Sequence, residues 1–308
     1  MSALLSLENV SKWYGPVIGV NDLTFEIGPG VTGLLGPNGA GKSTLLQLLT
    51  GQLRPSQGKV QVLGEEPWNN PGLCRNFGLC PEQDAFYEWM TGREFVKFAA
   101  NLAGLSGSEA RDATADAIAM TGMEPHQNRA IKGYSKGMRQ RIKMAQAMVH
   151  DPDVLFLDEP LTGTDPVARR SLVDVILELG RRGKSVLVSS HVLYEVQGMT
   201  SRVVMLHRGR LVAEGKLREI RDLIDKHPHR IVLVGDDRRA LAAQLMQFDD
   251  VVGVDVLKQE AAILVETTRP DEFYSRLPEL ALREETRIRE VYSDDDNLEA
   301  VFKYLVNP

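Results

Sequence analysis

Cysteine is scarce in this sequence of 308 residues, which contains only Cys74 and Cys80. Five residues separate the two thiols, a spacing that is not typical of metal ligands, and no histidine lies near them in the sequence. A disulfide framework and a zinc site are therefore not expected. We interpret the two residues as reduced thiols of a cytosolic protein.

Long apolar runs are also missing. No stretch approaches the roughly 18 to 20 apolar residues that a bilayer-spanning helix requires. The first five residues, MSALL, do not form the basic segment followed by a long apolar segment that marks a signal peptide. We therefore expect a chain that does not cross a membrane by itself.

The sequence also lacks an excess of positive charge. The sequence has 36 Lys and Arg against 42 Asp and Glu, a net charge of −6, so unspecific attraction to nucleic acid is not expected. The imbalance lies in residues 230–308, with 10 basic and 17 acidic side chains, whereas residues 1–229 have 26 and 25. This change indicates a boundary, and we predict one domain over residues 1–225 and a second over residues 226–308.

What the sequence does contain is the pattern of an α/β protein. Alternating apolar and polar residues predict strands at 4–10 and 20–27, and strands and helices then alternate along the chain. This order predicts an α/β core with an antiparallel β flank. From residue 230 the pattern restarts with the order βαββαβ, which is that of a small ferredoxin-like α+β domain. A last helix is predicted at 297–305.

The strongest motif is a glycine-rich loop between a predicted strand and a predicted helix. Its residues are Gly36, Pro37, Asn38, Gly39, Ala40, Gly41, Lys42, Ser43 and Thr44. They match G-x-x-x-x-G-K-[ST], in which backbone N–H groups and the amino-terminal end of the helix face the phosphates of a nucleotide. Lys42 is expected to reach the β- and γ-phosphates, and the Ser43 hydroxyl to ligate Mg²⁺. The motif predicts a P-loop NTPase.

A second motif lies about 120 residues further on, where the apolar segment 154–157 is followed by Asp158 and Glu159. The segment is predicted to be a buried strand, and ligands of doubly wound sheets bind at the carboxyl ends of such strands. We expect Asp158 to ligate Mg²⁺. Glu159 is expected to act as the base towards the water that attacks the γ-phosphate.

The residues around these motifs indicate the kind of NTPase. Residues 134–141, with the sequence YSKGMRQR, resemble the signature of ABC ATPases and lie shortly before the Asp-Glu strand, as in that family. Asp165 resembles the family's D-loop aspartate, His191 its switch histidine, and Tyr14 the aromatic residue that stacks on adenine. Residues 4–225 are identified as a member of the ABC ATPase family.

The resemblance implies a mechanism and partners. The first domain would have the ABC ATPase fold, with a helical lobe at about 84–150, and would hydrolyse ATP with Mg²⁺. Two cassettes would bind ATP head to tail, so that Ser135 and Gly137 of one chain meet the γ-phosphate held by the other. His191 would hold the same phosphate. The pair would act from the cytoplasmic face of the cell membrane on separate membrane subunits.

The sequence departs from the family's usual sequence at three places, and one of them is residues 161–164, which differ from the commonest D-loop sequence. Glu82 follows Pro81, where the family usually has a glutamine, and Gln83 comes next. If Glu82 takes the position, a carboxylate lies near Mg²⁺ and the water, and the sequence leaves open which of the two residues serves. Lys136 replaces a glycine of the signature, and we interpret its side chain as reaching solvent rather than phosphate.

Residues 86–90, with the sequence FYEWM, concentrate aromatic side chains. They are equally consistent with a docking surface for a short helix of the membrane subunit and with the helical lobe's own core. The wording of the signature and the appended second domain resemble the cassettes of ABC-2-type exporters. A soluble ABC ATPase that acts on nucleic acid or ribosomes is the alternative, although the sequence contains neither a second cassette nor a long coiled coil.

Overall fold

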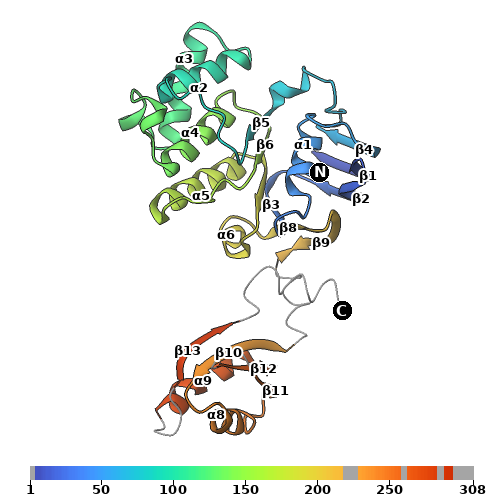
Figure 1. Ribbon diagram of the computed structural model, residues 1–308. Helices are drawn as coiled ribbons and strands as arrows, with labels where there is room; N and C mark the ends of the chain where they lie inside the picture. Colours follow the sequence, from blue (N-terminus) through green and yellow to red (C-terminus); the bar gives the residue numbers. More distant parts are fainter. Residues whose placement is uncertain (1–3, 218–227, 258–261, 283–287, 294–308) are drawn as a thin grey trace. The chain divides into compact units, whose positions relative to one another are not determined.

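The computed structural model describes residues 4–217, 228–257, 262–282 and 288–293 (Figure 1). Contacts between residues divide the chain into two compact units, 1–216 and 217–308. The predicted boundary at 225/226 stays a prediction, because residues 218–227 lie outside the described ranges.

A six-stranded sheet lies at the centre of the first unit. In spatial order its strands are β5 (Phe77–Cys80), β6 (Val154–Leu157), β7 (Ser185–Ser190), β3 (Gly30–Leu35), β8 (Arg202–His207) and β9 (Arg210–Lys216). The first five are parallel, and β9 pairs antiparallel with β8. Every residue of β6 and β7 is buried, as expected for apolar parallel strands that are covered on both faces.

The register of this sheet aligns the carboxyl ends of three neighbouring strands. Leu157 of β6 lies opposite Val188 of β7, and Ser190 of β7 lies opposite Leu35 of β3. The segments that follow β3, β6 and β7 therefore leave the sheet at one edge. They are the three segments in which the sequence predicts phosphate-binding or catalytic residues.

A second sheet is the antiparallel flank that the sequence predicts. Its strands, in the order β2, β1, β4, are β2 (Val17–Ile27), β1 (Leu5–Tyr14) and β4 (Gln57–Val62). One continuous apolar core joins this sheet, the central sheet and helix α1 (Lys42–Leu49). Because α1 packs into that core, the loop that precedes it is held rigidly between the two sheets.

Helices occupy the other end of the first unit, beside β5 in Figure 1. The α-helices there are α2 (Gly92–Leu102), α3 (Gly107–Met120), α4 (Lys136–Met148) and α5 (Pro166–Arg181). The short helix α6 (Leu193–Gln197) follows β7 and lies near β8 in Figure 1. Short 3₁₀ helices are η1 (Leu73–Asn76), η2 (Glu124–His126) and η3 (Ile131–Gly133). Of these, α2, α3 and α4 pack against one another and form the helical lobe.

The second unit has the ferredoxin-like topology that the sequence predicts. Its elements are β10 (His229–Gly235), α8 (Arg238–Leu245), β11 (Val251–Val256), β12 (Ala262–Thr267), α9 (Pro270–Ala281) and β13 (Ile288–Ser293). The strand order is β11-β12-β10-β13, with all neighbours antiparallel. Apolar residues of the sheet and of both helices form a separate core. The helix predicted at 297–305 lies outside the described residues.

Within the ranges that the structure describes, no helix combines the length and the apolar character that crossing a bilayer requires.

Candidate functional site

The three segments that leave the central sheet at one edge line a single cleft. Its volume is about 510 Å³, within the range of small-molecule sites. The glycine-rich loop follows β3, Glu159 follows β6 and His191 follows β7, while Tyr14 comes from the antiparallel flank. The lining residues are Tyr14, Val17, Ile18, Gly19, Asn38, Gly39, Ala40, Gly41, Lys42, Ser43, Thr44, Glu82, Glu159, Thr162 and His191.

The glycine-rich loop needs glycine for two reasons that the backbone shows. Gly39 and Gly41 have φ angles of 79° and 105°, which side-chain-bearing residues rarely adopt. A Cβ on Gly41 would also lie 2.5 Å from the carbonyl oxygen of Gly19. Gly41 precedes α1, whose first residue is Lys42. The loop therefore presents backbone N–H groups and a positive helix end to the cleft, the arrangement that binds anionic phosphates.

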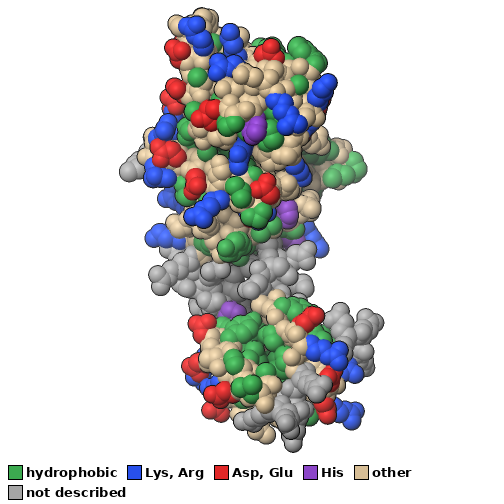
Figure 2. Space-filling view, turned by 90° about the vertical axis from the view of Figure 1, so that its left-hand side faces the viewer, with side chains coloured by type: hydrophobic (Ala, Val, Ile, Leu, Met, Phe, Trp, Pro, Cys, Tyr) green, Lys and Arg blue, Asp and Glu red, His purple; other side chains and the backbone are tan. Residues whose placement is uncertain are grey.

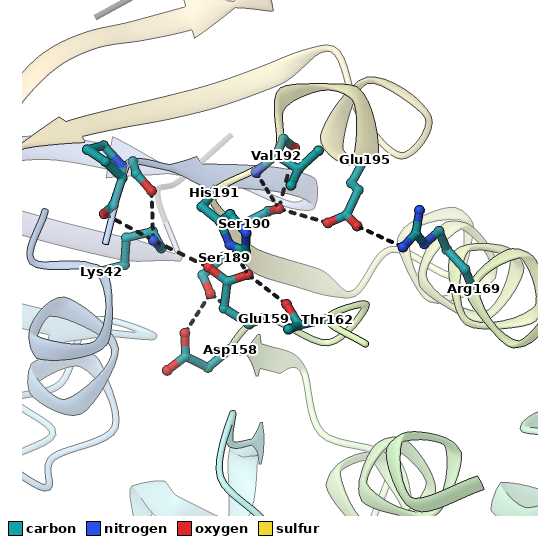
Figure 3. Close-up of polar contacts among 12 residues, drawn as sticks. Lys42, Asp158, Glu159, Thr162, Arg169, Ser189, Ser190, His191, Val192 and Glu195 are labelled. Carbon is teal, nitrogen blue, oxygen red and sulfur yellow. Dashed lines mark hydrogen bonds and ion pairs between the residues drawn. The ribbon is translucent and has the colours of Figure 1, made fainter. Parts of the chain in front are cut away.

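Lys42 is buried at the base of the cleft. Its ammonium donates to the carbonyl oxygens of Gly36 and Pro37, at 2.7 and 3.3 Å. It also pairs with Glu159, with 3.3 Å between Nζ and Oε1, and each side chain is only 7% exposed (Figure 3). The positive charge is thus held at the loop by carbonyls and by one carboxylate, in a place where water screens it little.

Glu159 contacts three other cleft residues through its carboxylate. Its backbone has φ 49°, a left-handed conformation that costs free energy in a residue other than glycine. The carboxylate oxygen Oε2 lies 2.8 Å from Nδ1 of His191 and accepts a hydrogen bond of 3.0 Å from the Thr162 hydroxyl (Figure 3). With Lys42 on its other oxygen, the carboxylate is fixed from three sides. Thr162 was not predicted from the sequence.

Ser189 is a second residue that the sequence reasoning missed. Its hydroxyl donates to Oδ1 of Asp158 at 2.5 Å and accepts the backbone N–H of Glu159 at 2.8 Å. One side chain from β7 therefore positions both carboxylate-bearing residues at the end of β6. The signal was present, because a serine at a fully buried position of an apolar strand requires polar partners.

Tyr14 lies at the rim of the cleft, at the end of β1, and is 43% exposed. Its hydroxyl is 3.4 Å from the hydroxyl of Thr44, and the ammonium of Lys12 lies 5.8 Å from its ring centroid. A Cβ on Gly19 would approach both the Tyr14 ring and Thr44 to less than 3 Å. Gly19 therefore allows the ring to lie close to the loop, a requirement that the sequence did not reveal.

The signature residues and Asp165 form a second cluster, outside the cleft. Ser135 caps α4 by accepting the N–H of Met138 at 3.3 Å. Asp165 caps α5 by accepting two backbone N–H groups, mainly that of Ala168, which lowers the pKa of its carboxyl. A Cβ on Gly137 would lie 3.3 Å from Oδ2 of Asp165, so the two caps are neighbours. None of the three residues lines the cleft of its own chain.

Comparison with known proteins assigns this arrangement to a family. The family described as "ABC transporter" matches residues 20–162, the stretch that runs from the flank through the glycine-rich loop and both carboxylates. An ATP-binding protein of an ABC transporter from Bacillus subtilis (YxlF, uncharacterized) is 37% identical over 71% of this chain and 72% of its own length. This chain belongs to the ABC transporter ATP-binding proteins. ATP hydrolysis is the characteristic activity of their cassettes.

Two further comparisons concern the second unit and the fold of the cassette. The daunorubicin/doxorubicin resistance ATP-binding protein DrrA of Streptomyces peucetius is 31% identical over 94% of this chain and 88% of its own length, so the match includes the second unit. A solved structure of an ATP-binding subunit of an ABC transporter superposes with a TM-score of 0.66, at 30% identity, over 72% of this chain and 93% of that chain. The predicted P-loop NTPase fold of an ABC ATPase is confirmed.

In this ABC cassette the loop after β5 contributes Glu82, and not Gln83, to the lining of the cleft. A buried lysine of α4 holds that loop in place. The Lys143 ammonium donates to the carbonyl oxygens of Pro81 and Glu82, at 3.0 and 2.9 Å, and pairs with Asp84 at 3.0 Å. The side chain of Lys143 is 3% exposed, so these oxygens are the partners that satisfy a buried charge.

The same loop of the cassette is attached to α4 a second time. Arg139 makes two hydrogen bonds to Glu88, at 2.6 and 2.9 Å, and lies 5.6 Å from the ring of Phe86. The hydrogen bonds lower the pKa of the exposed Glu88 carboxyl. Phe86 also packs edge-on against Phe95 of α2, with ring centroids 5.0 Å apart. Part of the aromatic segment therefore belongs to the lobe's own core.

The cassette's cleft fits a magnesium ion by the chemistry of its donors. Mg²⁺ takes oxygen ligands and keeps several waters, so two protein oxygens near phosphate are enough. Ser43 is exposed in the cleft. Asp158 carries a carboxylate at the end of β6, but it is buried and is not among the residues that line the cleft. Among the described residues, no group of three or more His, Cys, Asp and Glu that could hold a metal ion is found.

Proposed function

We propose that this chain is the ATP-hydrolysing subunit of an exporter, that it acts as a head-to-tail pair of cassettes, and that it docks on separate membrane subunits at the cytoplasmic face. One observation carries the catalytic part of the proposal. Lys42, Glu159 and His191 come from three strand ends and lie within bonding distance in one cleft behind the glycine-rich loop.

Nucleotide binding is assigned to the loop and to the flank. The N–H groups of residues 36–44 and the amino-terminal end of α1 would hold the phosphates. Lys42 would exchange its carbonyl partners for the β- and γ-phosphate oxygens, which carry more negative charge. Tyr14, exposed at the rim, would stack on the adenine ring. The cleft thus divides into a polar base and an aromatic edge.

Hydrolysis is assigned to Glu159 and His191. Glu159 would accept the proton of the water that attacks the γ-phosphate, and the contacts with Thr162 and His191 keep its carboxylate oriented for that step. His191 is 41% exposed towards the cleft and would contact the γ-phosphate and orient the same water. Glu159 accepts the proton and both groups position the reactants, and positioning is a main source of catalysis in phosphoryl transfer.

Magnesium is assigned to Ser43, Asp158 and Glu82. The ion, when bound, would neutralise charge on the β- and γ-phosphates. The hydrogen bond from Ser189 fixes one oxygen of the Asp158 carboxylate. Lys143 fixes the backbone of Glu82, so that its side chain stays at the cleft. Glu82 is chosen over Gln83 because it lines the cleft.

Pairing of two cassettes follows from the second cluster. Ser135, Gly137 and Asp165 form the ends of α4 and α5, and none of them lines the cleft of its own chain. If the positive end of α4 is to stabilise a γ-phosphate, that phosphate must be held by another chain. A head-to-tail pair satisfies the requirement twice, since each chain supplies one cleft and one signature.

Export and a membrane partner rest on similarity and on an exposed surface. DrrA, whose name states resistance to two drugs, matches both units of this chain, and expulsion of a compound is one route to resistance. On the helical lobe, Trp89 is 74% exposed and Tyr87 is 49% exposed, and their rings lie 6.2 Å apart. Exposed aromatic side chains of this kind suit the docking of a short helix.

The alternative is a soluble ABC ATPase that acts on nucleic acid or ribosomes. Such a protein is expected to present a basic surface. In Figure 2 the basic and acidic side chains on the visible face of the first unit are interspersed rather than gathered into a basic stripe. The nearly equal numbers of basic and acidic side chains in residues 1–229, 26 and 25, agree with this. The membrane-bound function is therefore favoured.

Co-purification tests the proposal. Tagged Glu159→Gln chain, which should bind ATP but hydrolyse it slowly, is expressed in its native host, and membranes are solubilised with ATP and Mg²⁺. A stoichiometric membrane protein with several spans is the expected partner. In a matched variant Trp89→Ala is added, which should reduce the yield of that protein without changing ATP binding. Recovery of only soluble proteins or nucleic acid would refute the exporter function and leave the ATPase function standing.

A further inference from the structure

Glu195 is a nearly buried carboxylate close to the cleft for which the proposed mechanism has no use. It lies on α6, the short helix that follows His191, and its side chain is 8% exposed. A carboxylate in such a place needs partners that offset the loss of hydration. Its two partners are Ser190 and Arg169, and both connect it to residues that act in ATP hydrolysis (Figure 3).

The first connection runs through the turn that carries His191. Ser190, the last residue of β7, accepts the backbone N–H of Val192 on its hydroxyl oxygen at 3.0 Å. This bond closes the turn around His191, which lies between the two residues. The hydroxyl proton has two acceptors in reach, Oε2 of Glu195 at 2.9 Å and the carbonyl oxygen of Val192 at 3.4 Å. The nearer and charged acceptor forms the stronger bond.

Glu195 therefore decides how the Ser190 hydroxyl points. With its proton directed to Glu195, the hydroxyl oxygen presents a lone pair to the Val192 N–H, and the turn stays closed. Ser190 is 2% exposed, so water cannot readily replace the lost acceptor if Glu195 is shortened. The turn would then loosen, and with it the imidazole that lies 2.8 Å from Glu159.

The second connection runs to the helix that begins at Asp165. Arg169 lies 3.6 Å from Oε1 of Glu195, and its backbone N–H donates to the carbonyl oxygen of Asp165 at 2.9 Å. Arg169 is 44% exposed, so water screens this ion pair and it is the weaker of the two partners. Glu195 thus forms an ion pair with the first turn of α5 through Arg169, and it accepts a hydrogen bond from Ser190 in the turn that carries His191.

We propose that Glu195 is a positioning residue for ATP hydrolysis, which orients His191 through the hydroxyl of Ser190. The inference rests on the proposed function, in that His191 must take part in hydrolysis. Removing the carboxylate lowers the rate of hydrolysis, because the imidazole and Glu159 lose their alignment, but it leaves ATP binding to the glycine-rich loop intact.

Steady-state ATPase kinetics on the full chain test this. Glu195→Ala is expected to lower kcat roughly tenfold to 100-fold, the loss expected when a reacting group is displaced by a fraction of an ångström to about 1 Å. KM for ATP should stay within about twofold of the wild-type value, since the loss lies in the chemical step. Glu195→Gln keeps a carbonyl oxygen for Ser190 and should recover most of kcat. The control is Glu178→Ala, which removes an exposed carboxylate of α5 that pairs only along its own helix.

Double variants decide whether the effect passes through Ser190 and His191. Ser190→Ala should resemble Glu195→Ala, and the two together should be no worse than either alone, because both remove one connection. In a His191→Ala background, Glu195→Ala should be silent. Normal kcat in Glu195→Ala or in Ser190→Ala would overturn the inference. A full additional loss when Glu195→Ala is added to His191→Ala would also overturn it.

The same series separates this inference from the proposed function. If His191→Ala itself leaves kcat unchanged, the role of His191 in hydrolysis is wrong and the inference fails with it. If His191→Ala lowers kcat and Glu195→Ala does not, only the inference fails. Thermal unfolding of each variant is measured alongside. If Glu195→Ala does not fold, the other two variants test the inference. Glu195→Gln is then expected to retain most of kcat, and Ser190→Ala is expected to show a reduced kcat.

Discussion

Single residues explain why the cleft is both strained and well ordered. Glu159 adopts a left-handed backbone conformation, and its N–H and its carboxylate are nonetheless all engaged by neighbours. Such strain persists only where the surroundings hold the residue firmly. Ser189 and Thr162 provide that hold on one side, and the ion pair with Lys42 provides it on the other.

Glu159→Gln is predicted to lower kcat for ATP roughly 100-fold to 10,000-fold, the range attributed to a general base. The amide has nearly the same shape but cannot accept the proton of the attacking water. ATP binding should persist, because the loop residues are unchanged. Phosphate release and titration with a fluorescent ATP analogue measure the two properties. Glu178→Gln on the exposed face of α5 is the control, and an unchanged rate in Glu159→Gln would disprove the assignment.

Cys80 should resist alkylation in the folded protein. It is buried next to the loop that carries Glu82, and burial raises its pKa from 9.0 to about 12, so the reactive thiolate is nearly absent at neutral pH. Exposed Cys74 is the internal reference. Iodoacetamide at pH 8 followed by mass spectrometry should label Cys74 alone, and both cysteines after denaturation. Rapid labelling of Cys80 in the folded chain would contradict the described burial.

The same pKa shift makes stability depend on pH at the alkaline end. Below pH 9 the Cys80 thiol is protonated in both the folded and the unfolded chain, so its contribution to folding stability is fully present. Between pH 9 and about 12 the unfolded chain loses this proton and the folded protein keeps it, which favours unfolding as the pH rises. Urea unfolding of Cys80→Ala and of wild type across this window should show a smaller loss of stability in the variant.

At the scale of secondary-structure elements, β5 and α4 together hold the loop that carries Glu82. Strand β5 delivers the loop, and α4, whose first turn is the signature, binds it through Lys143 and Arg139. The loop is therefore bonded to α4, and we expect the two to move together. A shift of α4 would move Glu82 as well, because the carbonyl oxygen of Glu82 is bonded to a side chain of that helix.

Lys143→Met is predicted to lower the free energy of unfolding by about 1 to 3 kcal/mol, because two carbonyl oxygens and Asp84 lose their shared donor. It should also reduce kcat, since Glu82 is no longer held at the cleft. Urea denaturation and ATPase assays measure the two effects. Lys97→Met, at an exposed position of α2, is the matched control. Equal stability of both variants would show that the clamp around Lys143 is not needed.

At the scale of the whole molecule, the cleft behind the glycine-rich loop and the signature lie apart in the first unit, and the signature residues Ser135 and Gly137 do not line that cleft. The cleft lies at the carboxyl ends of β3, β6 and β7, whereas the signature lies at the start of α4 in the helical lobe. Two copies are needed to bring one to the other. The proposed function therefore predicts a monomer that becomes a dimer when ATP is bound and not hydrolysed.

Ser135→Asp is predicted to abolish that dimer without harming the fold. Aspartate still accepts the N–H that Ser135 accepts as helix cap, but its charge would face the γ-phosphate held by the other chain. In a Glu159→Gln background with ATP and Mg²⁺, sedimentation should give a dimer for the parent and a monomer for the variant. Ser106→Asp, at the cap of α3, is the control. A dimer that persists in Ser135→Asp would refute head-to-tail pairing through the signature.

The sequence by itself determined what local patterns encode. The glycine-rich loop needs residues that tolerate positive φ and close contact, so the pattern of its glycines predicts the loop from the sequence. The strand before Asp158 is apolar because both faces of the sheet are covered. The order of strands and helices in the second unit also follows from short-range periodicity, and its topology agrees with the prediction.

Only the tertiary structure decided which residues meet. Ser189 and Thr162 lie 30 and 3 residues from Glu159, yet both bond to it, because β6 and β7 are neighbours in the sheet and the chain turns sharply after Glu159. The choice of Glu82 over Gln83 depends on which side chain faces the cleft, and Lys143 of a distant helix fixes that loop. Spacing along the chain does not predict which strand or helix supplies the distant partners Ser189 and Lys143, since packing between elements sets those contacts.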